Sequence, residues 1–357
     1  MKTNIYVFYG GKSAEHEVSL KSASAILNAL DKEKYNVYPV YITKEGVWSC
    51  LGLLKEEIKS VEQLQVESKE PVSQSIGKFL TEVLDDSQRN IVFPALHGTF
   101  GEDGTLQGLF EIINIPYVGN EVLSSAVGMD KVIMKDIFVK HNLPVTKYTS
   151  VRLHLWKEDE EKVLDTIEKE LTYPYFVKPA NLGSSVAVNK AVNREELKKA
   201  IDEAFNYDTK VIIEEEVVGR EVQVSVVGNE NPKASLPGEF IIHRPFFDYE
   251  AKYNDKSTTP VVPARLTPEV TEKVRKLAVD AFKVLNCYGL ARVDIFVTDD
   301  NEVLINEVNT MPGFTALSMT PVLWKATDGT TYPELVEKLI ALAFERYEQK
   351  NRLRRTR

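Results

Sequence analysis

The residues with the clearest chemical potential lie in one segment, RVDIFVTDDNEVLINEVNTMPGFT, which covers residues 292–315. Apolar and polar residues alternate on both sides of Asp-Asp-Asn, which predicts two strands joined by a tight turn. With a two-residue turn at residues 300–301, Asp294 lies directly opposite Glu307 on one face of the hairpin. Asn309 follows Glu307 by two positions and therefore shares that face.

Two opposed carboxylates and an amide oxygen form a cluster of hard oxygen donors. Like charges opposed across two strands are destabilising without a counter-ion, so the arrangement predicts a bound cation. Mg²⁺ is the natural occupant because it prefers oxygen ligands and shares them with substrate phosphates. Arg292 adds positive charge beside Asp294. The alternative is a solvent-facing hairpin with scattered acids, and a one-residue change of register would remove the cluster.

A candidate phosphate site follows an apolar run in the segment KPANLGSS, residues 178–185. Lys178 supplies a charge, and the small residues after it let backbone N–H groups and hydroxyls approach phosphate oxygens. An ordinary strand-to-strand turn is the alternative. The N-terminal GGKS is not a complete P-loop, because Tyr6 stands where that motif requires Gly. With Lys131 and the acidic hairpin, the pattern predicts a nucleotide–Mg²⁺ site and an ATP-dependent enzyme, without identifying the acceptor.

In the first third of the chain, strand-like and helix-like patterns alternate. Apolar runs predict strands at residues 5–9, 35–42 and 91–95, with helical spacing at residues 18–30 and 106–113. This alternation is typical of a parallel α/β sheet, whose ligands gather at the carboxyl ends of the strands. The loops at Gly10 and His97 fit that position.

The rest of the chain mixes strands and helices. We predict a helix around Asp130 and Lys135, and strands at residues 145–151 and before Lys178. Two more strands are separated by a break at Gly219, and the helices of the last third cover residues 268–285 and 332–347. Domain boundaries are expected near residues 120 and 210.

Composition limits the class of protein. The chain has 357 residues, enough for two or three domains, and its 43% hydrophobic and 27% charged residues exclude disordered, collagen-like and coiled-coil chains. A net charge of −9 argues against a nucleic-acid partner but allows a local phosphate site. Two distant cysteines predict no disulfide and a reducing compartment. Neither a signal peptide nor a membrane-spanning run is recognisable, so we expect a cytoplasmic protein with no membrane partner.

Eight segments, in this order and spacing, resemble the D-alanine–D-alanine ligases of the ATP-grasp superfamily. They extend over nearly the whole chain and read GGKSAEHEVSL, LHGTFGEDGTLQGLFE, GMDKVIMK, FVKPANLGSSV, EEEVVGREVQVSVVG, FDYEAKY, ARVDIFV and INEVNTMPGFTALS. The resemblance implies a three-domain ATP-grasp architecture of α/β and α+β class. A Rossmann-like parallel α/β domain would cover residues 1–120, a central subdomain 121–210, and a C-terminal subdomain with the metal site and a lid loop 211–357.

The resemblance also implies a reaction. ATP would phosphorylate the carboxylate of a first D-alanine, and the amine of a second would displace phosphate to form the dipeptide used in peptidoglycan synthesis. ATP and Mg²⁺ are the implied cofactors, with two metal ions and Mn²⁺ as a substitute. The resemblance leaves open whether a monovalent cation is also required, and it implies a homodimer. A lid is expected because the acyl phosphate would hydrolyse in open water.

Residue roles follow from the same resemblance. ATP would be held by the lysines, the small-residue loop, an adenine hinge and a ribose contact: Lys131, Lys178, Ser184, Ser185, Glu214, Glu215, Glu216, Val217 and Glu221. The metal ligands would be Asp294, Glu307 and Asn309. The amino acids and the tetrahedral intermediate would be bound by Glu15, His97, Arg292, Gly313, Ser318 and Lys252. Tyr253, on the lid, would close toward Glu15 and Ser184.

Plainer interpretations exist for several of these residues. Glu15 could be an acid in the first turn of a helix, favoured there by the helix dipole. His97 could form hydrogen bonds within a loop, and Tyr253 could be a packed aromatic. Residues 214–216 could be a solvated acidic run. At the level of function, the alternatives are another ATP-grasp ligase and a non-catalytic nucleotide-binding protein. Ala187 and Phe247 depart from the family, which usually has Gly and often Tyr at these positions. The Tyr-bearing lid resembles ligases that make D-alanyl-D-alanine rather than D-alanyl-D-lactate.

Overall fold

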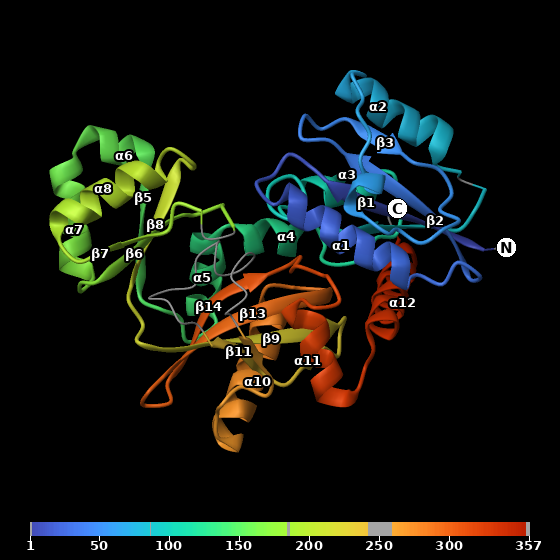
Figure 1. Ribbon diagram of the computed structural model, residues 1–357. Coiled ribbons are helices and arrows are strands. Elements are labelled where there is room, and N and C mark those ends of the chain that lie inside the picture. The colour runs from blue at the N-terminus through green and yellow to red at the C-terminus, as the bar shows by residue number, and fades with distance from the viewer. Residues whose placement is uncertain (1, 86, 184–185, 242–258, 355–357) are drawn as a thin grey trace.

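The computed structural model describes residues 2–85, 87–183, 186–241 and 259–354. Its strands form three sheets, and Figure 1 shows them as three parts. The N-terminal sheet lies beside the last helix, the central sheet stands apart with its own helices, and the C-terminal sheet lies below both. Cys50 and Cys287 are both free, as the composition predicted. Among the described residues, no helix is long and apolar enough to cross a membrane.

The N-terminal sheet has the strand order β3-β2-β1-β4. Strand β1 pairs in parallel with β2 and β4, and the short β3 pairs antiparallel with β2. Because β1 lies inside the sheet and is buried along nearly its whole length, its residues 5–9 form a continuous apolar run. The elements of this part are β1 (Thr3–Gly10), α1 (His16–Ala29), β2 (Tyr35–Ile42), β3 (Trp48–Cys50), η1 (Val61–Leu64), α2 (Val72–Lys78), η2 (Phe79–Val83), β4 (Asn90–Pro94) and α3 (Thr105–Ile112).

The central sheet has the order β5-β8-β6-β7, with all neighbours antiparallel. Its helices share a core with the sheet. Helix α5, which precedes the sheet, begins where the Asp130 carboxylate accepts hydrogen bonds from the N–H groups of Val132 and Ile133. The elements are α4 (Val122–Met129), α5 (Lys131–Lys140), β5 (Tyr148–Arg152), α6 (Leu153–Glu158), α7 (Glu160–Glu170), β6 (Tyr175–Pro179), β7 (Asn189–Ala191), α8 (Arg194–Ala204) and β8 (Lys210–Glu215).

The C-terminal sheet has the order β12-β11-β9-β13-β14, with β10 added to β9. Helix α10 covers one face and begins with Thr267 as its cap and Pro268 in its first turn. The elements are β9 (Gly219–Gly228), β10 (Lys233–Ala234), β11 (Gly238–Ile241), β12 (Thr259–Val261), α10 (Pro268–Val284), β13 (Gly289–Thr298), β14 (Val303–Asn309), α11 (Met319–Asp328) and α12 (Tyr332–Asn351).

Helix α12 links the two ends of the chain. Its buried side chains Leu335, Leu339 and Ala343 belong to the same hydrophobic core as Ile5 of β1. Figure 1 shows this helix beside the N-terminal sheet. The last helix therefore fastens the C-terminal sheet to the N-terminal one, which fixes the position of the site loops of both sheets.

The predicted elements are present with shifted ends. The first three predicted strands are confirmed as β1, β2 and β4, and the sheet is parallel apart from β3, which the sequence pattern did not predict. The expected strand at residues 145–151 begins only at Tyr148. The two strands expected around Gly219 are present as β8 and β9, with the break at residues 216–218 and β9 beginning at Gly219. The domain boundaries near residues 120 and 210 stay a prediction.

The hairpin register confirms one expectation and corrects another. Asp294 does pair with Glu307. The turn, however, is not the two-residue turn expected at residues 300–301, because Val297 pairs with Val303 and Asn301 adopts a left-handed φ of 62°. A β-bulge after Asp294 shifts the register back by one residue. The longer turn shifts the register by one residue and the bulge shifts it back. Asp294 and Glu307 are therefore paired although the predicted turn is wrong.

Candidate active site

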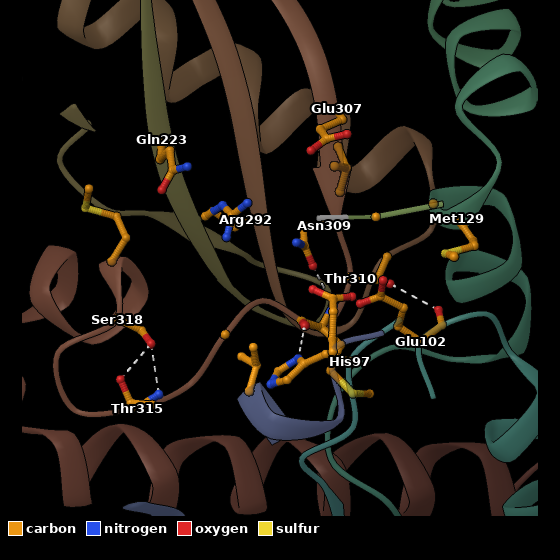
Figure 2. A pocket seen from close by; sticks show the side chains of 18 of the residues that line it. His97, Glu102, Met129, Gln223, Arg292, Glu307, Asn309, Thr310, Thr315 and Ser318 are labelled. Carbon is orange, nitrogen blue, oxygen red and sulfur yellow. Dashed lines mark hydrogen bonds between the residues drawn. The ribbon is translucent and has the colours of Figure 1, made fainter. Parts of the chain in front are cut away.

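One cavity of about 550 Å³ lies between loops of the N-terminal sheet and strands β9, β13 and β14. Figure 2 shows the side chains around it. Eight of the predicted site residues line it: Glu15, His97, Lys131, Arg292, Glu307, Asn309, Gly313 and Ser318. Others do not line it: Lys178, Glu214, Glu215, Glu216, Val217, Glu221 and Asp294. Ser184, Ser185, Lys252 and Tyr253 lie outside the described residues.

The acidic hairpin forms one wall of the cavity. Asp294 is almost completely buried, and its two carboxylate oxygens accept hydrogen bonds from Nε and Nη2 of Arg292, both at 2.7 Å. Across the strand, Glu307 Oε2 lies 3.7 Å from the Lys131 ammonium. Asn309 pairs with Arg292 in register. The cations Arg292 and Lys131 thus reduce the repulsion between the two opposed carboxylates.

This oxygen set fits a magnesium ion that is completed by a substrate. Asp294, Glu307 and Asn309 offer two carboxylates and one amide oxygen, and each Asp294 oxygen keeps a second lone pair beyond its bond to Arg292. Within the described ranges, no group of three or more His, Cys, Asp or Glu residues is placed to hold a metal alone. Mg²⁺ bound by one or two carboxylates usually takes further oxygens from phosphates.

The acidic end of the cavity is made by Glu15 and Glu102. A Cβ atom placed on Gly183 would lie 3.3 Å from Glu15 Oε2 and 3.8 Å from Glu102 Oε1, and one on Gly98 would lie 2.9 Å from Glu15 Oε2. Both carboxyl groups therefore lie against glycine backbone. Burial and the nearby Glu15 charge raise the pKa of Glu102 well above its ordinary value. This end suits a positively charged group.

His97 connects the loop after β4 to the turn after β14. Its ring is buried, with Nδ1 at 2.9 Å from the Met311 carbonyl oxygen and Nε2 at 2.9 Å from Ser22 Oγ. A carbonyl only accepts, so Nδ1 carries the proton and Nε2 accepts from the Ser22 hydroxyl. Burial lowers the pKa of His97, which favours the neutral ring. His97 thus holds both loops against the cavity.

The hydroxyl end of the cavity is made by Thr315 and Ser318. Ser318 Oγ accepts a hydrogen bond from the Thr315 backbone N–H at 2.9 Å and lies 2.9 Å from Thr315 Oγ1. Ser318 also precedes helix α11 as its cap residue. Figure 2 places these hydroxyls on the opposite side of the cavity from Glu102. Backbone N–H groups at a helix start attract anions, so this end suits a carboxylate.

The predicted adenine hinge begins with a buried ion cluster. Glu214 lies between Lys135 and Lys178, with ion-pair distances of 2.5 and 2.6 Å, and its side chain is 3% exposed. Its neighbours point elsewhere, since Glu215 pairs with Lys147 and Glu216 with Lys190. Lys178 is therefore held near the Glu214 carboxylate, not at the cavity surface.

Glu221, the predicted ribose contact, and Ala187, a departure from the family, are both among the described residues. Glu221, on β9, accepts a hydrogen bond at its Oε1 from the side chain of Asn306, on β14, at 3.4 Å. Ala187 adopts a φ of 54°, in the left-handed region. A glycine has no steric penalty there, whereas an alanine costs about 1–2 kcal/mol. The family's usual glycine at this position is therefore explained by backbone conformation, while Phe247 lies outside the described residues.

Glu102, Thr315 and Gln223 are among the cavity residues that were not chosen from the sequence. Glu102 belongs to the LHGTFGEDG loop, where the position after a strand was a usable signal. Thr315 lies within the C-terminal motif. Gln223 had no signal, because the pairing of β9 with β13 joins segments about 70 residues apart and cannot be read from spacing.

Comparisons with known proteins agree with this geometry. Family models described as D-ala D-ala ligase N-terminus and C-terminus match residues 4–120 and 137–341. A D-alanine–D-alanine ligase of Geobacillus thermodenitrificans is 51% identical over 356 residues, which covers 98% of each chain. The corresponding ligase of Bacillus cytotoxicus is 48% identical and covers 99% of each chain.

Solved structures show the same fold. The D-alanine–D-alanine ligase from Coxiella burnetii superposes with a TM-score of 0.81 at 36% identity, covering 98% of this chain and 96% of that one. A D-Ala:D-Ser ligase from Enterococcus faecalis gives a TM-score of 0.80 at 34% identity, covering 96% and 100%. The fold and site thus define an ATP-grasp ligase. The chain belongs to the D-alanine–D-alanine ligase family, whose members use ATP and Mg²⁺.

Proposed function

We propose that the protein joins two D-alanines to D-alanyl-D-alanine, with ATP as the energy source, for peptidoglycan precursor synthesis. The supporting observation is that a single cavity contains an acidic end, a hydroxyl end, and the Arg292–Glu307 wall between strands and loops. An amino acid brings an ammonium and a carboxylate, which suit these two ends. Full-length similarity to a D-alanine–D-alanine ligase supports the same reaction.

The residue roles form one sequence of steps. Glu15 binds the ammonium of the first D-alanine. The carboxylate of that D-alanine attacks the γ-phosphorus of ATP, which releases ADP and leaves an acyl phosphate. Ser318 and Lys252 hold the carboxylate of the second D-alanine. Its ammonium loses a proton to solvent, and the resulting amine attacks the acyl carbon. The C–O bond to phosphate then breaks, and inorganic phosphate leaves.

Charge stabilisation is the main task of the surrounding residues. Arg292 and the Gly313 N–H stabilise the oxygen of the tetrahedral intermediate. Lys131, Lys178 and the hydroxyls of Ser184 and Ser185 bind the ATP phosphates. The hinge residues 214–217 hold the adenine and Glu221 the ribose. Mg²⁺, held by Asp294, Glu307 and Asn309, would neutralise phosphate charge when bound.

The reaction itself is the first prediction. Protein incubated with ATP, Mg²⁺ and D-alanine should release phosphate and form the dipeptide, measured by phosphate assay and mass spectrometry with D-serine and D-lactate as competing acceptors. Phosphate release with another amino acid but not with D-alanine would assign the chain to a different ATP-grasp activity. Tight ATP binding without turnover would indicate a non-catalytic nucleotide-binding protein.

A second prediction concerns the lid segment FFDYEAKY. Tyr253→Phe should raise the Michaelis constant for D-alanine about 5- to 10-fold, because the side chain proposed to close over the site would lose its hydrogen-bonding hydroxyl. The Michaelis constant for ATP should change little. Kinetics with ATP and D-alanine varied separately test this. Tyr249→Phe, in the same segment, is the matched control, and equal effects of the two variants would refute a specific role for Tyr253.

Finer features also stay proposals from the family resemblance. We propose two Mg²⁺ ions that Mn²⁺ can replace, a homodimeric assembly and a cytoplasmic location, and we leave activation by a monovalent cation open. Metal titrations of activity and light scattering would test the ion count and the assembly.

A further inference from the structure

Gln223 is a buried polar side chain that faces the cavity without a use in the roles assigned so far. It lies on β9, is 4% exposed, and lines the cavity. No described residue donates a hydrogen bond to its Oε1. Leaving a buried oxygen unpaired costs about 1–3 kcal/mol, so such a group in a cavity wall calls for a partner from outside the chain.

The sheet register places Gln223 close to the reacting groups. Gln223 pairs directly with Asp294, so both side chains share one face, and Arg292 is two residues away on the same neighbouring strand. Figure 2 shows Gln223 and Arg292 on neighbouring strands at the same side of the cavity. An oxygen on Gln223 is therefore within reach of a substrate that contacts Arg292.

Gln223 is also connected, through the neighbouring strand, to helix α11, which follows Ser318. On its other side it pairs with Gly238, and a Cβ atom placed on Gly238 would lie 3.0 Å from Met319 Sδ. Met319 directly follows Ser318 and also lines the cavity. Glu15 and Glu102 mark the acidic end, where the first amino acid is proposed to bind. The geometry therefore assigns Gln223 to the second amino acid.

We propose that Gln223 Oε1 accepts a hydrogen bond from the amine of the second, acceptor amino acid and directs its nitrogen toward the acyl carbon. This inference rests on the proposed function and adds a residue that positions the acceptor. The amide oxygen is too weakly basic to remove the proton that the ammonium must lose, so Gln223 positions the nucleophile and does not act as a base. An amine keeps an N–H bond after it attacks, so the hydrogen bond persists in the tetrahedral intermediate. A hydroxyl acceptor has only one O–H and loses it in the reaction, so this contact favours amine acceptors.

Steady-state kinetics of Gln223→Met test the proposal. Met has a similar length and no oxygen, and replacing an unpaired buried oxygen with an apolar group leaves stability nearly unchanged. With ATP saturating and D-alanine varied over a range that resolves both amino-acid sites, the Michaelis constant of the second D-alanine should rise about 10- to 100-fold. The constants for ATP and the first D-alanine should change less than about threefold.

Two comparison variants separate positioning from packing. Gln223→Glu keeps an oxygen that can accept, so its second-site Michaelis constant should stay well below that of the Met variant. An equal rise in both variants would mean that the oxygen does not accept from the amine, and would overturn the proposal. Thr320→Val removes another buried hydroxyl, one residue beyond Met319 and outside the cavity lining, which has no hydrogen-bond partner among the described residues. This variant should leave all constants unchanged.

The remaining outcomes are also decisive. If unmodified protein forms the dipeptide and Gln223→Met keeps its second-site constant, the inference fails while the proposed function stands. If unmodified protein forms no dipeptide from D-alanine, the proposed function fails and the inference fails with it. A parallel rise of all three constants, or a fall in melting temperature, would show a structural role instead.

Discussion

Glu307→Gln and Asp294→Asn should each reduce dipeptide formation at least ~100-fold, because several kcal/mol of charge stabilisation around the transferring phosphoryl group are lost. Glu307 lines the cavity beside Lys131, and the buried Asp294 faces it across the hairpin. An amide keeps the shape of either side chain but offers a metal one neutral oxygen. Phosphate release measured across a range of Mg²⁺ concentrations tests this, and Glu307→Gln should also require more Mg²⁺.

The Asp294 variant affects more than the metal. Asp294 holds both Nε and Nη2 of Arg292, so its amide would also loosen the residue proposed to stabilise the tetrahedral intermediate. Glu307→Gln is therefore the cleaner test of the metal site. Glu302→Gln changes an exposed acid near the turn of the same hairpin and should keep normal rates. Near-normal rates with Glu307→Gln would remove the metal assignment.

Local patterns were sufficient to predict the elements that carry the site. The apolar run of β1 and the alternation in β13 and β14 predict strands, because the period of the apolar residues follows which side chains are buried. The pairing of Asp294 with Glu307 was predicted from an assumed two-residue turn, and it is present only because a bulge offsets the longer turn. The bulge after Asp294 that restores this pairing was not predicted.

Contacts between distant segments were beyond reach of spacing. Gln223 meets Asp294 only because β9 pairs with β13, and His97 meets Met311 only because loops of two sheets adjoin. The Glu214–Glu216 run shows the same limit. It can be interpreted from sequence as a solvated acidic run or a hinge, yet one of its members lies buried between two lysines. Long-range packing decides which of three consecutive glutamates turns inward.

That buried glutamate supports the largest stability prediction. Burial alone would raise the pKa of Glu214, but attraction to Lys135 and Lys178 outweighs it and lowers the pKa to about 2. Burial lowers the pKa of Lys135 despite the Glu214 charge. Glu214→Gln leaves two buried ammonium groups without their carboxylate, which should cost about 3–5 kcal/mol. Urea unfolding at neutral pH measures the loss.

The matched control is the next residue along the strand. Glu215 pairs with Lys147, whose side chain is 60% exposed, so water screens the attraction. Glu215→Gln should cost no more than about 1 kcal/mol. Similar losses in the two variants would contradict the view that burial of the Lys135–Glu214–Lys178 cluster sets its energy.

The pH dependence of unfolding provides the independent test. A carboxyl with a pKa of about 2 in the folded state and an ordinary value when unfolded stabilises the protein above the ordinary value, and that contribution is lost as pH falls toward 2. In Glu214→Gln this acid-side loss should disappear. On the alkaline side the variant should gain stability as pH rises, because its buried lysines, now without an anion, release protons more readily when folded than when unfolded. A Gln variant whose stability falls with acid as in the unmodified protein would place the titrating carboxyl elsewhere.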